Sequence, residues 1–232
     1  MLIINKPKML IFDWDGTLCD SLQRIALCLR MSATDVGLPV PSFEAAKNIV
    51  GLGLDEVMIE LFPDADLTTQ AQLRQRYSEH FIREDAQPSP FFPGVRAHLE
   101  TLRDEGYIMA VATGKSRRGL DRVLGGLDMK GFFHSTRCAD ETASKPDPHM
   151  LLSLLEEFAT LPQAALMVGD TSYDMAMARA ANTPRLAVSY GAHSQVRLAS
   201  YEPVACIEKF EDINHILAQC SWLNEGGGSQ AG

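Results

Sequence analysis

The sequence is poor in the features of disulfide-stabilised proteins, membrane proteins and polyanion-binding proteins. Lysine and arginine together number 21 against 30 acidic residues, so the net charge is −9 and broad attraction to nucleic acid or an anionic membrane is not expected. No window approaches the roughly 18 apolar residues of a membrane span. The five cysteines are scattered and form no C-x-x-C pair: Cys19, Cys28, Cys138, Cys206 and Cys220. This pattern indicates free thiols in a reducing compartment instead of a disulfide framework or a zinc site.

These absences favour a cytoplasmic protein. Polar residues and a proline from Asn5 to Lys8 interrupt the only apolar stretch near the N-terminus before a signal-peptide core can form. The hydrophobic share of 46% over 232 residues is enough to bury a sizeable core without disulfides or structural metals. A site for an anionic ligand would then need positive groups placed locally.

Short apolar runs recur along the chain and predict buried strands. Their bounds are Met9 to Phe12, Tyr107 to Ala112, Ala164 to Val168, and Arg185 to Val188. They are continuously apolar without alternation, which is typical of a parallel sheet covered on both faces. Helical patterns separate them, for example from Val95 to Leu102 and from Asp147 to Phe158. Asp147 is the expected N-cap of the second helix and Pro148 its first residue. The alternation predicts an α/β fold, a Rossmann-like doubly wound parallel sheet.

One stretch breaks this alternation and shows only helical periodicity. Apolar stripes run from Leu22 to Val36 and from Leu73 to Phe81, and glycine and proline breakers such as Gly51-Leu52-Gly53 punctuate the stretch. We therefore predict an α-helical cap at residues 19–87, inserted into a core made of residues 1–18 and 88–225. The breaker at Gly51 is expected to face the active site. The glycine-rich residues 226–232 are predicted to be a flexible tail.

Asp13-Trp14-Asp15-Gly16-Thr17 follows the first predicted strand directly and is the strongest chemical signal. Two acids at i and i+2 place two carboxylates at the end of a buried strand, and Gly16 allows the sharp turn after them. A carboxylate at this point can attack phosphorus and form an acyl phosphate, while the second acid exchanges protons with the leaving group and with water. Taken alone, the motif is equally consistent with a calcium-type ligand or an ordinary turn.

Two further acids follow a later predicted strand. In Gly169-Asp170-Thr171-Ser172-Tyr173-Asp174 the spacing i, i+4 puts both carboxylates on one side of a loop and a first helical turn. With Asp13 they provide the all-oxygen ligand set that Mg²⁺ prefers. The alternative is an N-cap acid next to a surface acid.

Two other segments offer groups for a phosphate. Thr113 and Gly114 end another predicted strand, where a hydroxyl and free backbone N–H groups can hold phosphate oxygens. Lys145 stands just before a helix, where its ammonium would offset the charge of phosphate and clustered acids. Taken singly, these are a Thr-Gly turn and a solvated lysine. Arg117 and Arg118 are assigned to a solvated face, with attraction of an anionic substrate as the weaker alternative.

These four motifs, in this order, resemble those of the haloacid dehalogenase superfamily in its phosphatase branch, and most closely its phosphoglycolate phosphatase-like subgroup. The resemblance spans residues 9–190 and implies a Rossmann-like core with a helical cap inserted after the first motif. It implies that Asp13 is the nucleophile, Asp15 the acid and base, and that Thr113, Gly114 and Lys145 bind the phosphoryl group. Mg²⁺ would be held by Asp13, the backbone carbonyl of Asp15 and Asp170, with Asp174 assisting directly or through water.

The function expected from this resemblance is Mg²⁺-dependent hydrolysis of a small phosphorylated metabolite. A phosphosugar mutase of the same superfamily would need the same four motifs, so these motifs do not separate the two reactions. A non-catalytic phosphate-binding module is the alternative from a different class. Trp14 and Gly114 depart from the residues common in such relatives, methionine or leucine and asparagine respectively, and leave the substrate open. The sequence does not indicate an oligomeric state.

Overall fold

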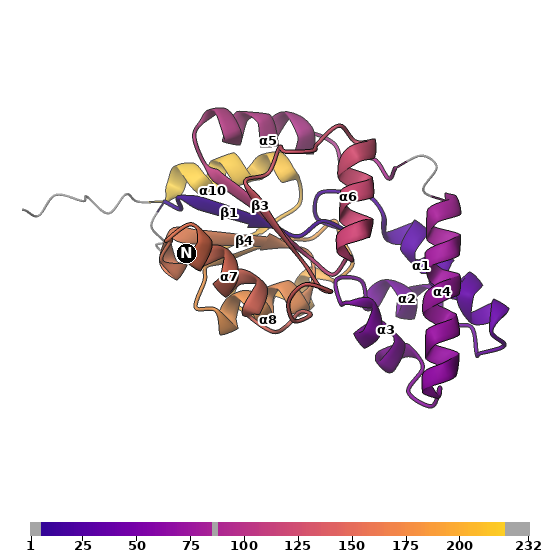
Figure 1. Ribbon diagram of the computed structural model, residues 1–232. Coiled ribbons are helices and arrows are strands. Elements are labelled where there is room, and N and C mark those ends of the chain that lie inside the picture. The colour runs from indigo at the N-terminus through magenta and orange to yellow at the C-terminus, as the bar shows by residue number, and fades with distance from the viewer. Residues whose placement is uncertain (1–5, 85–87, 221–232) are drawn as a thin grey trace, which may run out of the picture.

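A parallel sheet of six strands forms the centre of the computed structural model, which describes residues 6–84 and 88–220 (Figure 1). The strands are β1 (Met9–Phe12), β2 (Ile108–Thr113), β3 (Ser135–Cys138), β4 (Ala165–Gly169), β5 (Arg185–Val188) and β6 (Cys206–Ile207). Their order across the sheet is β3-β2-β1-β4-β5-β6. This is the order of a doubly wound fold, which reverses direction between β1 and β4, and ligands bind at the carboxyl ends of the strands there. The predicted fold class is confirmed.

Helices and two short 3₁₀ segments account for the rest of the regular structure in residues 6–84 and 88–220. In chain order they are α1 (Leu22–Asp35), α2 (Phe43–Asn48), α3 (Leu54–Leu61), α4 (Leu67–Glu84), α5 (Val95–Asp104), α6 (Arg117–Gly126), α7 (His149–Glu157), η1 (Pro162–Ala164), α8 (Ser172–Ala180), α9 (Gln195–Ala199), η2 (Phe210–Asp212) and α10 (Ile213–Gln219). Within the described residues no helix has both the length and the apolar character needed to cross a membrane.

The two faces of β1 bury side chains against different helices. Leu10 and Phe12 belong to one cluster with residues of α5, α6 and α10, whereas Met9 and Ile11 pack with α7 and α8. Figure 1 shows α5 and α10 on one side of the sheet and α7 and α8 on the other. Since side chains alternate along a strand, Asp13 continues the row of Met9 and Ile11 toward α8.

The strand prediction was right for four strands and incomplete for two. β2 and β4 each lie one residue later than the apolar runs from Tyr107 and Ala164. β3 was not predicted because its sequence, Ser-Thr-Arg-Cys, lies at the sheet edge, where polar side chains reach solvent. β6 contains only two residues, too few to leave a pattern.

The predicted start of α7 was wrong by one residue. Pro148 is the N-cap and its neighbour His149 is the first helical residue. Asp147 still accepts a hydrogen bond at the start of the helix, because its Oδ1 accepts the N–H of His149 at 2.9 Å. A carboxylate at this position satisfies one of the N–H groups that have no partner inside the helix.

Helices α1 to α4 pack on one another and form a second apolar cluster beside the sheet (Figure 1). α1 packs against α4 and α2, and its buried residues include Ile25 and Leu29 from the predicted stripe. Within the described residues 19–84 no named strand occurs. We call these four helices the cap and retain residues 19–87 as its proposed bounds. The predicted tail at 226–232 lies outside the described residues.

The cap cluster should contribute measurable stability of its own. Leu73→Ala removes a fully buried side chain and leaves a cavity, so we expect a loss of about 2–5 kcal/mol in the free energy of unfolding. The matched control is Leu67→Ala in the same helix, where the side chain is 80% exposed and the expected change is within about 0.5 kcal/mol. Urea unfolding monitored by circular dichroism measures both variants, and equal effects would contradict the assignment of Leu73 to a core.

Candidate active site

The register of the sheet brings the separate acidic motifs together. Phe12 pairs with Val111 on β2 and with Val168 on β4. Asp13 therefore leaves β1 beside the ends of both neighbours, and its N–H donates to the carbonyl of Val168 at 2.9 Å. Asp170 follows the end of β4, so both acids flank the switch point between β1 and β4. A crevice at this point is where doubly wound proteins hold ligands.

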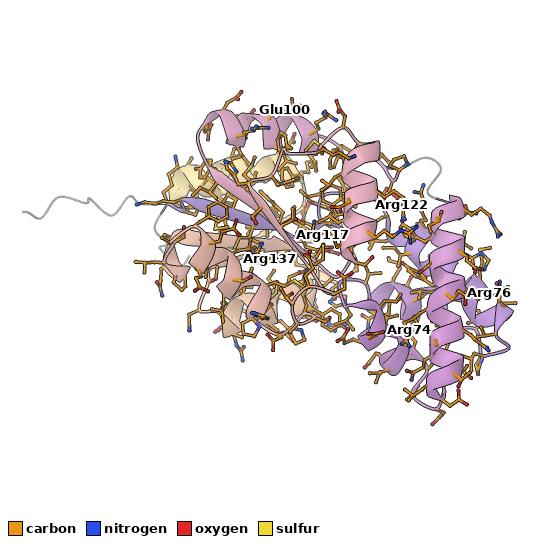
Figure 2. All side chains as sticks on the ribbon, in the orientation of Figure 1. Arg74, Arg76, Glu100, Arg117, Arg122 and Arg137 are labelled. Atoms are coloured by element: carbon orange, nitrogen blue, oxygen red, sulfur yellow. The ribbon has the colours of Figure 1, made fainter. Side chains whose placement is uncertain are left out.

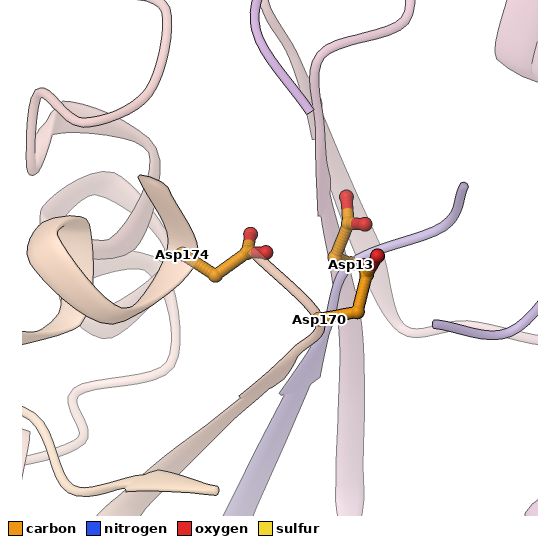
Figure 3. Close-up of side chains that lie close together, drawn as sticks. All are labelled: Asp13, Asp170 and Asp174. Carbon is orange, nitrogen blue, oxygen red and sulfur yellow. The ribbon is translucent and has the colours of Figure 1, made fainter. Parts of the chain in front are cut away.

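Three buried carboxylates converge at this edge of the sheet (Figure 3). Asp13, Asp170 and Asp174 each offer an oxygen, and these oxygens all lie within 4.8 Å of one another. Asp174 comes from the first turn of α8, and Figure 3 shows its side chain pointing from the helix toward the other two. The predicted i, i+4 spacing of Asp170 and Asp174 thus places both acids in one cluster with Asp13.

Neighbouring donors fix the orientation of Asp170. The hydroxyl of Thr17 donates to its Oδ1 at 2.8 Å, and the N–H of Ala192 donates to its Oδ2 at 2.7 Å. Gly16 has a φ of +85°, and a Cβ atom there would overlap the Asp170 carboxylate. Gly16 therefore provides both the left-handed turn and the space for this acid.

A capping box fixes Asp174. The N–H and the hydroxyl of Thr171 donate to its Oδ2 at 3.0 and 2.7 Å, while its own N–H donates back to the Thr171 hydroxyl at 3.2 Å. Such reciprocal bonds satisfy free N–H groups at a helix start. Here they also hold the acid rigidly inside the cluster.

Lys145 supplies the positive charge among the acids. Its Nζ lies 2.5 Å from Oδ1 of Asp13 and 2.7 Å from Oδ1 of Asp174, and the side chain is buried. The structure therefore brings Lys145 to the predicted nucleophile, although 132 residues separate them in sequence. A buried ammonium needs such partners, since an unpaired charge in the interior is strongly unfavourable.

The crowding of charges shifts several pKa values. Burial, followed by the charges of Asp174 and Asp170, raises the pKa of Asp13 well above 3.8 even though Lys145 opposes the shift. Burial and the nearby Asp174 raise the pKa of Asp170 to about 7. Burial alone would lower the pKa of Lys145, but Asp13 and Asp174 raise it. The three carboxylates therefore lack sufficient positive charge around them.

This deficit matches a divalent cation. Oδ2 of Asp13 is buried and has no hydrogen-bond partner among the described residues. The donors are all carboxylate oxygens, the ligands that Mg²⁺ prefers, and a cation would balance the excess negative charge. The residues present thus fit a metal ion, with the oxygen of Asp13 that lacks a partner as one ligand.

Asp15 lies apart from the cluster with different partners. Its Oδ1 accepts the hydroxyl of Ser21 at 2.6 Å and lies 2.9 Å from Nζ of Lys115. It lines a cavity between the cap and the core with a volume of about 180 Å³. The two acids of the first motif thus occupy different environments, one at the acidic cluster and one at the cavity.

Thr113 and Gly114 end β2 next to this cavity. Oγ1 of Thr113 is buried and accepts the N–H of Lys115 at 3.2 Å. Gly114 lines the cavity, and a Cβ atom there would overlap the carbonyl oxygens of Gly51 and Leu52. The cap backbone can approach the end of β2 this closely because residue 114 has no side chain.

The cap contacts the core through residues 48–53. The N–H of Gly53 donates to the Ser144 hydroxyl at 2.7 Å, and Nε2 of His193 lies 2.8 Å from the carbonyl oxygen of Asn48. Arg197 donates to the Asn48 side chain at 2.6 Å. The breaker Gly51-Leu52-Gly53 therefore lies over the strand ends, which confirms its predicted position facing the site.

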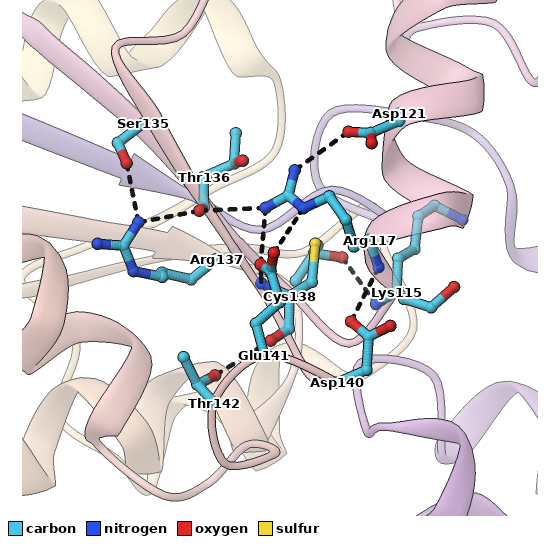
Figure 4. A network of polar contacts seen from close by, with 12 residues as sticks. Lys115, Arg117, Asp121, Ser135, Thr136, Arg137, Cys138, Asp140, Glu141 and Thr142 are labelled. Atoms are coloured by element: carbon cyan, nitrogen blue, oxygen red, sulfur yellow. Dashed lines mark hydrogen bonds and ion pairs between the residues drawn. The ribbon is translucent and has the colours of Figure 1, made fainter.

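The two arginines at the start of α6 have different surroundings. Figure 4 shows Arg117 in a polar network, where its guanidinium donates to both carboxylate oxygens of Glu141 at 2.8 and 2.7 Å and to Asp121 at 3.2 Å. Its charge is thus paired with two acids of the α/β domain. Arg118 is exposed and lines the cavity. Arg122 lies on the side of α6 that faces α4 (Figure 2), with its guanidinium 5.6 Å from the centre of the Phe81 ring.

Three residues near the site received no role from the sequence. Thr17 and Thr171 were visible inside the quoted motifs, but their bonds to Asp170 and Asp174 depend on loop conformation. Lys115 follows Gly114, and its contact with Asp15 requires that β1 and β2 be neighbours in the sheet. An adjacent-strand assignment would have suggested the Lys115 contact, and the capping-box spacing from Thr171 to Asp174 would have suggested the Thr171 bonds. No local signal identifies the role of Thr17.

Fold and site together define an α/β enzyme with a buried acidic centre at the switch point of its sheet. The sequence pattern of the haloacid dehalogenase-like hydrolase family matches residues 10–188, and the chain belongs to this family. Its resemblance to phosphoglycolate phosphatases within the superfamily is likewise confirmed, and the chain is a hydrolase of the phosphatase type.

Relatives cover nearly the full length. Phosphoglycolate phosphatase of Rhodospirillum rubrum is 32% identical over 97% of this chain and 95% of its own, and that of Mannheimia succiniciproducens is 30% identical over 90% and 98%. A crystal structure of a predicted phosphoglycolate phosphatase from Haemophilus somnus superimposes with a TM-score of 0.79 at 25% identity, covering 91% of this chain and 98% of the other. A hydrolase from Pseudomonas syringae shares the fold with a TM-score of 0.84 at 21% identity, covering 92% and 99%.

The raised pKa of Asp170 predicts how stability depends on pH in metal-free protein. An acid whose pKa rises from 3.8 to about 7 on folding holds its proton more tightly in the folded state. Its contribution to the free energy of unfolding is therefore greatest below about pH 4 and falls as the pH rises through about 7. Asp170→Asn should lack this fall, so we expect it to gain stability relative to wild type toward pH 8 in EDTA.

Thermal unfolding between about pH 4 and pH 8 measures this difference. The control is Asp147→Asn, an exposed acid outside the cluster, which should follow the wild type. Added Mg²⁺ should raise the Tm of the wild type at pH 7 more than that of Asp170→Asn. Parallel pH profiles for wild type and Asp170→Asn would contradict the charge deficit inferred for the cluster.

Proposed function

We propose that this phosphatase hydrolyses a small phosphate monoester through an aspartyl-phosphate intermediate on Asp13 and depends on Mg²⁺. The observation that carries the proposal is the state of the Asp13 carboxylate. One oxygen is held by Lys145, and the other is buried beside two further acids, with no hydrogen-bond partner in the part of the chain that the structure describes. Phosphoglycolate, the substrate in the names of the relatives, is the reference substrate. A cytoplasmic location stays a prediction from the sequence.

In the first step, Asp13 attacks phosphorus and the bond from phosphorus to the ester oxygen breaks. Asp15 donates a proton to that oxygen, so the alcohol leaves neutral into the cavity that Asp15 lines. In the second step, Asp15 takes a proton from water, which attacks phosphorus and releases Asp13 and inorganic phosphate. Asp13 keeps its own oxygens throughout.

Other residues position the phosphoryl group. Thr113 uses an oxygen lone pair for the N–H of Lys115, which leaves its own hydrogen available to a phosphate oxygen. The N–H groups near Gly114 and the ammonium of Lys145 complete the proposed phosphate contacts. Mg²⁺ would be held by Asp13, Asp170, Asp174 and the backbone carbonyl of Asp15, and would supply the positive charge that draws the nucleophile and phosphate together.

Replacing the nucleophile should abolish turnover without unfolding the protein. Asp13→Asn is nearly isosteric, but its amide cannot attack phosphorus, so we expect phosphate release to fall below detection. The matched control is Asp20→Asn, an exposed acid in the same segment, which should retain activity. The assay measures phosphate released from p-nitrophenyl phosphate with Mg²⁺ and with EDTA. Activity of Asp13→Asn within tenfold of wild type, at an unchanged Tm, would remove Asp13 from its role.

Replacing the proton donor should affect poor leaving groups most. Asp15→Asn is expected to slow the first step by about 10²- to 10⁴-fold for an alkyl phosphate, because an alkoxide needs a proton to leave. For p-nitrophenyl phosphate the loss in this step should be much smaller, since nitrophenolate leaves without one. Rapid-quench measurement of phosphorylation with both substrates tests this, and an equal loss for both would argue against Asp15 as the acid.

A further inference from the structure

The cavity between the cap and the core is where the alcohol part of the substrate would lie. Asp15, residues 114–116 and 118–119, and Arg122 form its core side, and residues 49–52 together with α1, α3 and α4 form its cap side. If Asp15 protonates the leaving oxygen, as proposed above, the group attached to that oxygen projects into this cavity. The cavity walls therefore indicate which kind of group the substrate carries on that oxygen. This inference rests on the proposed function.

The cap side of the cavity is apolar. Ile25 and Leu29 of α1, Val57 of α3, and Tyr77 and Phe81 of α4 contribute to it, and none of the described cap residues that line it carries a charge. A carboxylate such as that of glycolate would find no counter-charge on this side. An apolar group would instead displace water from these walls, which is favourable in proportion to the area covered.

The cations on the core side are largely engaged. Lys115 pairs with Asp15 at 2.9 Å, and its Nζ lies 4.8 Å from the centre of the Phe81 ring. Arg122 lies over the same ring at 5.6 Å. Arg118 lines the cavity but is exposed, so its charge is well solvated. The cavity wall near Asp15 thus presents aromatic and aliphatic surface. The cation nearest to Asp15 is Lys115, which is already paired with it.

The size of the cavity indicates the size of the group. A cavity of about 150 Å³ with apolar walls accommodates benzene. The volume here is about 180 Å³, so a ring-sized body fits, whereas a two-carbon glycolate would leave most of the apolar wall uncovered. Tyr77 and Phe81, with ring centres 5.7 Å apart, offer aromatic surface for such a body.

We propose that the preferred substrates are phosphate monoesters of primary alcohols that carry an apolar body of about the size of an aromatic ring, and that Tyr77 and Phe81 determine this specificity. The ring lies against the cap helices, and the ester oxygen lies next to Asp15. Similarity to phosphoglycolate phosphatases does not oppose this, because specificity depends on local side chains and does not follow from the fold.

The test compares three substrates on the full chain with Mg²⁺: ethyl phosphate, 2-phenylethyl phosphate and phosphoglycolate. All three are esters of primary alcohols, so the chemical step is similar and the comparison reports on the bound group. Phenylethyl phosphate should exceed each of the others by at least about tenfold in kcat/KM, the discrimination expected of an apolar pocket. A kcat/KM for phosphoglycolate or ethyl phosphate equal to or above that of phenylethyl phosphate would overturn the inference.

A cap variant tests the assigned residues. Tyr77→Ser should lower the ratio of kcat/KM for phenylethyl over ethyl phosphate by about fivefold or more. Tyr201→Ser, a partly buried tyrosine packed in the core away from the cavity, is the matched control and should keep the wild-type ratio. If Tyr77→Ser fails to fold, Ile82→Ser replaces it, because Ile82 lines the cavity and is 46% exposed. An unchanged ratio in the folded cap variant would contradict the role of this wall.

The outcomes separate this inference from the function on which it rests. If none of the three esters and no p-nitrophenyl phosphate releases phosphate with Mg²⁺, the proposed function fails and the inference fails with it. If all release phosphate without a preference for the ring, the phosphatase mechanism stands and only the apolar specificity is wrong.

Discussion

The need to hold three carboxylates together inside the protein governs the structure of the site. Asp13, Asp170 and Asp174 are buried within 4.8 Å of one another, with Lys145 as their ammonium partner. Like charges at such distances repel strongly in a low-dielectric interior. The surrounding bonds from Thr17, Ala192 and Thr171 keep Asp170 and Asp174 in place against this repulsion. The resulting deficit of positive charge is what makes the site suitable for a metal ion.

The topology of the sheet is the reason that these groups meet. β1 lies between β2 and β4, so the residues that follow the three strands share one edge. Asp13 continues the β1 row that faces α8, which supplies Asp174, while the neighbouring Trp14 belongs to the apolar cluster on the opposite face. The segment that follows β1 thus contributes to the candidate active site and to the apolar core at consecutive positions.

The cap and the acidic cluster provide different environments. The acids of the cluster belong to the core, whereas the cavity next to Asp15 is enclosed mostly by apolar residues of the cap. The two environments meet at the first motif, because Asp13 faces the cluster and Asp15 faces the cavity. In the proposed reaction, the phosphate and the group attached to it would be recognised by different parts of the chain.

The sequence by itself determined the fold class, four of the six strands and the residues of the acidic motifs. Continuous apolar runs marked the buried strands, and acids directly after them marked the carboxyl edge of the sheet. Local pattern did not reveal β3, whose polar residues lie at the sheet edge, or β6, which is too short. Only the tertiary structure decided that Lys145 reaches Asp13 across 132 positions, that Lys115 pairs with Asp15, and that cap helices enclose an apolar cavity. These contacts join segments distant in sequence, so they depend on strand order and helix packing, which no short stretch of sequence encodes.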